Sequence, residues 1–132
     1  LFLHENGLND GSNDPATALN SSIETSQVDI ADGDNFMFIR RMIPDLTFEG
    51  STESSPVVAM TLQTRNFPGT TFNEQSSHNI TRSSTSPVEQ FTEQVHVRLR
   101  GRSVALKIEN TTTGVQWRLG SPRIDIRPDG RR

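Results

Sequence analysis

The chain has 132 residues, enough for about one domain, and only 31% of them are hydrophobic, which predicts a thin core. No apolar run approaches the ~18 residues of a membrane-spanning helix, and the absence of cysteine excludes disulfides and thiolate sites. The formal net charge of -3 is divided unevenly, because residues 1–90 carry 12 acidic and 4 basic side chains whereas residues 91–132 carry 4 acidic and 9 basic ones.

Residues 1–34 predict an extended, irregular arm. The stretch is dense in turn-forming residues, its apolar residues follow no period, and it contains seven acidic residues and no lysine or arginine. The chain begins at Leu1 rather than methionine. We therefore expect it to be a fragment of a longer polypeptide, with an acidic arm over 1–34 and a β domain over 35–132.

The segment 35–48 predicts a strand that ends near Pro44, since proline cannot continue a ladder of backbone hydrogen bonds. Its apolar residues fall on both faces, with Phe36 and Phe38 on one and Met37, Ile39 and Ile43 on the other. A strand of this kind is expected to be covered on both sides.

The segment 55–67 alternates in its middle, with Val58, Met60 and Leu62 on one face, and predicts a half-buried strand. Residues 66–90 follow with little apolar content. They predict a long polar loop, and loops of that length are usually functional, disordered or ordered by another subunit.

The segment 94–110 predicts a β-hairpin whose two-residue tip is Gly101 and Arg102, with glycine first as a type II′ turn prefers. In this register every apolar residue lies on one face, in the opposed pairs Leu99–Val104, Val97–Leu106 and Val95–Ile108. A shift of one residue would destroy that agreement, so the pattern indicates a well-specified register.

A four-residue loop at 111–114 extends the pattern into a third strand, where Trp117 faces Ile108 and Leu119 faces Leu106. A bend follows at 120–122, and the last strand places Ile124 and Ile126 on one side. No stretch combines helix caps with a 3.6-residue period. The predicted class is therefore all-β, arranged as an antiparallel meander.

Patterns that carry catalysis or bind cofactors are not found. The histidines His4, His78 and His96 lie near no nucleophilic serine motif, and no glycine-rich loop precedes a helix. The acidic cluster at 29–35 fails the EF-hand pattern, which needs a glutamate where Arg40 stands, although another kind of cation loop is left open. We expect a protein that is not an enzyme and holds no cofactor.

The basic residues of the last third suggest an interaction surface. Arg98, Arg100, Lys107 and Arg118 fall on the polar face of the predicted meander, Arg102 lies at the hairpin tip, and Arg131 and Arg132 end the chain. Such a face neutralises phosphates without reading bases. The alternative is an arginine-rich face that pairs with acidic residues, such as those of 1–34, within a subunit or between subunits.

Residues 101–132 resemble the C-terminal end of a family of large structural proteins from short-tailed bacteriophages. The similar elements are the Gly101-Arg102 tip, the alternating strand 104–108, the Gly-x-x-Trp-Arg-Leu-Gly stretch at 114–120, the short strand 124–126 and the terminal arginine-rich 127–132. The segment 54–69 also resembles an upstream part of these tail nozzle proteins, also called tail tubular protein B. The resemblance covers about half of the chain and excludes residues 1–50.

The resemblance implies a non-enzymatic virion component located in the phage tail. Family members assemble as rings, usually hexamers, attach to an adaptor ring below the portal, and extend the channel through which double-stranded DNA is ejected. They are rich in β structure, including propeller-like domains. It also implies contacts with other tail proteins, with channel DNA held without sequence specificity.

Two other functions fit the residues. A β module of a tail fibre or tip would bind a host receptor or carbohydrate, and would be expected to form a trimer with an exposed aromatic groove. A nucleic-acid-binding β protein would use the arginine face alone.

Overall fold

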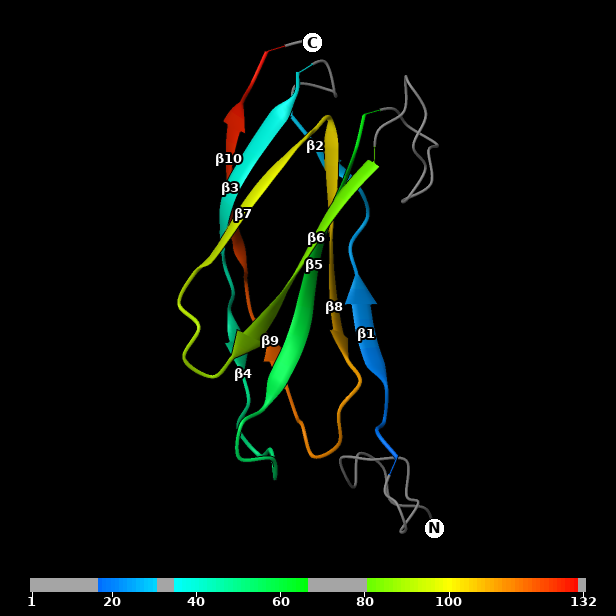
Figure 1. Ribbon diagram of the computed structural model, residues 1–132, viewed down its shortest axis with the longest axis vertical. Coiled ribbons are helices and arrows are strands. Elements are labelled where there is room, and N and C mark those ends of the chain that lie inside the picture. Colours follow the sequence, from blue (N-terminus) through cyan, green and yellow to red (C-terminus); the bar gives the residue numbers. More distant parts are fainter. Residues whose placement is uncertain (1–16, 31–34, 67–80, 131–132) are drawn as a thin grey trace.

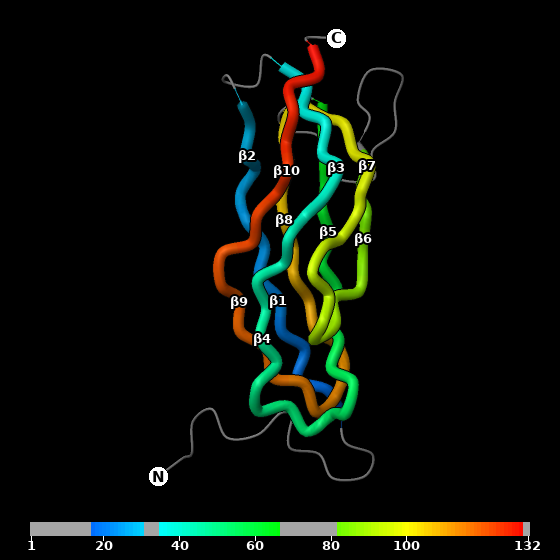
Figure 2. Tube along the Cα trace, turned by 90° about the vertical axis from the view of Figure 1, so that its left-hand side faces the viewer, coloured from blue at the N-terminus to red at the C-terminus, as the bar shows by residue number. Residues whose placement is uncertain are grey.

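The computed structural model describes residues 17–30, 35–66 and 81–130 (Figure 1). Within those ranges the chain contains ten strands and no helix, and every strand pairing is antiparallel. The predicted all-β class is thus confirmed. The strands form two facing layers rather than one continuous meander (Figure 2).

The wider layer is a five-stranded sheet around β8, Ser103–Asn110. One edge of β8 pairs with the short strands β1, Ser21–Glu24, and β2, Val28–Asp29. The other edge pairs with β5, Val57–Arg65, which in turn pairs with β6, Thr81–Glu89.

The narrower layer has the order β10-β3-β7, with β3 at Met37–Ile43, β7 at Val95–Gly101 and β10 at Arg123–Pro128. Two short strands, β4 at Leu46–Thr47 and β9 at Arg118–Leu119, pair with each other. Pro44 follows β3 directly, as predicted. The neighbouring Asp45 carbonyl accepts a hydrogen bond from the Gly120 N–H at 2.7 Å, so the chain of β3 and β4 stays beside that of β9 and β10.

The apolar core lies between the layers and draws on both of them. The predicted alternation of β5 is confirmed, because Val58, Met60 and Leu62 are each 1% exposed. On β7 the side chains alternate between buried and exposed along the whole strand. The core is completed by residues of β3, β6 and β8 and of the loops near β4 and β9, namely Met37, Ile39, Met42, Phe48, Val88, Val104, Leu106, Ile108 and Val115.

The predicted hairpin at 94–110 is wrong, although its apolar residues are correctly assigned to the core. Val95, Val97, Leu99, Val104, Leu106 and Ile108 are all buried. However, β7 pairs with β3 and β8 pairs with β5, so the two strands lie in opposite layers. Alternation determines which face of a strand is apolar, and it leaves the partner strand undetermined.

Gly101 forms the corner between these layers, and its φ is not left-handed as a type II′ turn would require. The residue is buried, and a Cβ placed on it would lie 2.7 Å from the Cβ of Thr64 in β5. Glycine is therefore needed for close approach between two backbones rather than for a special dihedral angle.

The predicted pairing of Trp117 with Ile108 and of Leu119 with Leu106 is also wrong. Leu119 pairs with Leu46, and both Trp117 and Leu119 are partly buried against the core. Their apolar side chains thus reach the core from outside the strand ladder of β8. The indole Nε1 of Trp117 donates a hydrogen bond to the Ser21 hydroxyl at 3.0 Å, which connects this segment to β1.

Two segments expected to be irregular contain strands. Residues 81–89 of the predicted loop form β6, and the predicted arm contributes β1 and β2, while 1–16, 31–34 and 67–80 lie outside the described residues. These strands lie at the edges of the five-stranded sheet, so each one forms backbone hydrogen bonds with a single neighbouring strand. Only the face of an edge strand that points toward the core needs apolar residues. On β6 that face includes buried Val88, and the Thr61 and Thr85 hydroxyls lie 2.8 Å apart across the ladder.

The apolar residues of β3 are distributed differently from the prediction. The register shifts between Ile39 and Arg41, so Met42 becomes buried and Ile43 is 37% exposed. An extra residue in one strand reverses the alternation beyond it. Phe38 is only half-buried, so β3 is fully covered on the core side alone.

Candidate functional site: an arginine face

The outer surface of the narrower layer collects arginines from three strands that are distant in sequence. On β7, Arg98 and Arg100 are exposed between buried core residues. On β10, Arg123 and Arg127 alternate with the inward-facing Ile124 and Ile126. We call this surface the arginine face and define it by Arg40, Arg41, Arg98, Arg100, Arg123 and Arg127.

The register shift in β3 brings Arg40 and Arg41 to the same carboxylate. Arg40 Nε donates a hydrogen bond to Asp125 Oδ2 at 2.7 Å, and Arg41 Nε lies 3.4 Å from the same oxygen without hydrogen-bond geometry. The hydrogen bond from Arg40 lowers the pKa of Asp125, and the charges of Arg40, Arg41 and Arg127 add to that effect against a smaller opposing influence of burial. Asp125 is therefore an acceptor held ionised by a cationic surface.

A second acidic residue, Asp129, lies at the other end of the face. Arg100 Nε donates to Asp129 Oδ2 at 2.6 Å, and an Arg100 terminal nitrogen donates to the Asp129 carbonyl at 3.1 Å. The two aspartates balance two of the six arginines, so the arginine face has a net positive charge.

Phe36 is buried beneath cations instead of between the layers. The guanidinium carbon of Arg100 lies 3.9 Å from the ring centroid and that of Arg102 lies 4.7 Å away, while the Phe36 side chain is 8% exposed. These distances are typical of cation–π contacts. The Phe36 backbone also pairs with the end of the chain, through Phe36 N–H to Gly130 O and Asp129 N–H to Phe36 O.

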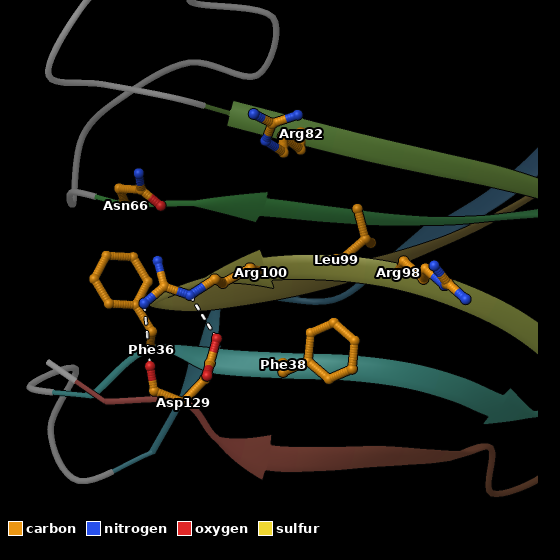
Figure 3. Close-up of a pocket in the computed structure, with 8 residues that line it drawn as sticks. All are labelled: Phe36, Phe38, Asn66, Arg82, Arg98, Leu99, Arg100 and Asp129. Carbon is orange, nitrogen blue, oxygen red and sulfur yellow. Dashed lines mark hydrogen bonds and ion pairs between the residues drawn. The ribbon is translucent and has the colours of Figure 1, made fainter. Parts of the chain in front are cut away.

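A pocket of about 440 Å³ opens where the edges of β6 and β7 meet. Figure 3 shows Arg82 and Asn66 reaching it from the wider layer and Arg98, Arg100 and Phe38 from the narrower one. Neither the Arg82 nor the Arg98 guanidinium has a hydrogen-bond or ionic partner among residues 17–30, 35–66 and 81–130. The pocket therefore presents two cations from opposite layers to one space.

The predicted basic residues do not form a single face. Arg98 and Arg100 belong to the arginine face, but Lys107 projects from the outer side of the wider layer and pairs with Glu109 at 3.1 Å. Arg118 is exposed on β9, and Arg102 lies at the corner over Phe36. The error follows from the wrong hairpin, because β7 and β8 present their outer faces on opposite sides of the molecule. Arg131 and Arg132 lie outside the described residues.

Four members of the face, Arg40, Arg41, Arg123 and Arg127, and the positions of Phe36 and Phe38 beside it were not predicted from the sequence. Arg40 and Arg41 reach the face because β3 lies between β7 and β10. The basic residues at 98, 100, 123 and 127 are visible in the sequence as outward positions of alternating strands, whereas the adjacent Arg40 and Arg41 share a face only because of the register shift in β3. Predicting that these arginines share one surface requires knowing that β3 lies between β7 and β10.

Other candidate sites receive little support from the described part of the chain. His96 is exposed on β7, and no group of three or more histidine, cysteine, aspartate or glutamate residues is arranged to hold a metal ion in the ranges that the structure covers. The 29–35 cluster lies partly outside the described residues. Among the described residues, no helix is long and apolar enough to cross a membrane. No protein-family model matches the chain, and no curated protein matches its sequence.

Proposed function

We propose that the chain is a structural β module of a short-tailed phage tail, in which the arginine face lies against the phosphate backbone of channel DNA. The observation that carries the proposal is the assembly of six arginines from β3, β7 and β10 on one outer surface with only two aspartates. The setting in the tail rests on the resemblance of residues 101–132 to tail nozzle proteins.

The chemistry of the face suits contact without sequence reading. Guanidinium groups bind phosphate oxygens in bidentate geometry and are always charged at physiological pH. A β-sheet surface projects them over an area instead of into a groove, so base edges are not addressed. DNA that must slide through a channel requires binding of this kind, which is salt-dependent and indifferent to sequence.

Filter binding of duplex DNA across a salt series tests the proposal. Arg98→Gln removes a guanidinium of the face that has no ionic partner among the described residues, and Lys107→Gln removes a cation from the opposite side of the molecule as a matched control. We expect Arg98→Gln to weaken binding to all duplex sequences equally and to reduce the slope of log K against log salt by about 0.9. Lys107→Gln should leave both unchanged.

Two results would contradict the proposal. One is the absence of duplex binding by the unaltered protein at low salt, and the other is an equal loss in the two variants. The ring expected from the resemblance is tested separately, since a hexamer with a central lumen in negative-stain images supports the nozzle and a trimer supports the tail fibre.

A further inference from the structure

The two layers have unequal widths, and among the described residues the difference leaves part of the core side of the wider layer without a facing strand. The wider layer has four strand positions, because β1 and β2 share one edge of β8, whereas the narrower layer has three. On one side of the molecule β7 lies next to β6. On the other side the wider layer extends past β10 at β2, as Figure 2 shows.

Two apolar side chains mark the uncovered strip. Ile23 pairs with Ile108, and Val28 pairs with Val104. Directly opposed residues of an antiparallel pair project from the same face, so Ile23 and Val28 point toward the core side as their buried partners do. They are nevertheless 51% and 52% exposed, and we call this pair the apolar shelf.

The strand beside the shelf has a free edge. Within the described ranges β10 pairs only with β3, and its inward residues Ile124 and Ile126 are partly buried. An edge strand offers a row of unpaired backbone N–H and C=O groups to an incoming strand. A strand added to this edge would widen the narrower layer by one position and cover the apolar shelf.

The charges along β10 restrict what such a strand contains. The outward residues Arg123 and Arg127 are exposed at this edge. An antiparallel pairing of two β10 strands centred on Asp125 would place Arg123 opposite Arg127 and Asp125 opposite Asp125, and like charges directly opposed are destabilising. Centred on Ile126 instead, the pairing would place Arg127 opposite Asp125, but Arg40 and Arg41 already hold that carboxylate, so a second copy of β10 is a weaker partner than a strand with acidic residues of its own.

We propose that the free edge of β10 accepts an extended segment of another polypeptide that alternates apolar and acidic residues. The apolar residues would cover Ile23 and Val28, and the acidic residues would lie beside Arg123 and Arg127 on the outer surface. Backbone hydrogen bonds supply affinity in this mode of recognition, and alternate side chains supply specificity. The inference uses Arg123 and Arg127 of the arginine face, but it does not require that the face binds DNA.

A charge-reversal experiment tests the proposal with three short peptides. One alternates valine and glutamate, one alternates valine and lysine, and the third has the composition of the first with its valines and glutamates segregated. Fluorescence anisotropy should show the valine–glutamate peptide bound about tenfold more tightly than the valine–lysine peptide, since two cross-strand charge pairs change sign. The segregated peptide should bind weakly.

The double variant Arg123→Glu with Arg127→Glu should reverse the preference in favour of the valine–lysine peptide. A variant that failed to fold would lose both peptides, so reversal is specific to the proposed edge. Ile23→Ser should weaken binding of the alternating peptide, whereas Phe91→Ser, at an 86% exposed apolar side chain between β6 and β7, should not. The proposal is overturned if neither alternating peptide binds, if the segregated peptide binds equally well, or if the double variant keeps the original preference.

Discussion

At the scale of single residues, Asp125 reduces the repulsion between neighbouring arginines of the arginine face. Its carboxylate accepts a hydrogen bond from Arg40 and lies beside Arg41, two cations that are adjacent in sequence and project to the same side. Without this acceptor the register shift in β3 would leave two guanidinium groups repelling each other. Removing it should therefore disturb the shift as well as the local charge.

We predict that Asp125→Asn changes the pH dependence of stability. The pKa of Asp125 is lowered in the folded protein, so its ionised form contributes stability above the unfolded-state pKa of about 3.9, and this contribution is lost as pH falls through the folded-state pKa. Urea denaturation should show the variant less stable than the original at neutral pH, with a difference that shrinks as pH falls below about 4. A difference of constant size from neutral to acidic pH would contradict this origin.

At the scale of elements, the corner between β7 and β8 is the step that makes two layers out of one alternating sequence. We predict that Gly101→Ala lowers the free energy of unfolding by about 1–3 kcal/mol, because the new Cβ would lie 2.7 Å from the Cβ of Thr64. Chemical denaturation followed by the fluorescence of Trp117 measures the change.

Substitution by asparagine shows whether a glycine is required for close packing or for its backbone dihedral angle. At Gly130, where φ is +79° and a Cβ would meet no described residue within 4 Å, asparagine should be tolerated better than alanine because it adopts left-handed conformations more readily. At Gly101 the larger side chain should be at least as destabilising as alanine. If asparagine were the better substitute at Gly101, the close-approach explanation would fail.

The same elements show what sequence could and could not predict. Period-two alternation identified the buried residues of β5, β7 and β8, since that pattern is imposed by burial of one face whichever strand is the partner. It did not reveal which strands pair. The alternation of β7 and β8 is the same whether the two strands pair as a hairpin or lie in opposite layers joined by a corner. It also missed β6, whose serine and threonine residues are placed in the sheet by backbone pairing, and the arginine face, which depends on β3 lying between β7 and β10.

At the scale of the whole molecule, charge and apolar burial make separate contributions to the assembly that we propose. Residues 1–90 have a net charge of -8 and residues 91–132 a net charge of +5, so copies of the chain offer complementary charges to one another. Any apolar surface buried between copies makes a contact of the other kind. Two salts distinguish the charge contribution from the apolar contribution. Any added salt screens charges, whereas sulfate also strengthens apolar burial.

We therefore predict that sodium chloride dissociates the proposed ring of copies as its concentration rises from about 0.1 to 1 M, where the screening length falls from roughly 10 to 3 Å. Sodium sulfate at the same ionic strength should dissociate it less, because its effect on charge is offset by stronger apolar burial between the copies. Sedimentation velocity measures both series. An oligomer unaffected by molar chloride would show that the charge division of the chain does not hold its copies together.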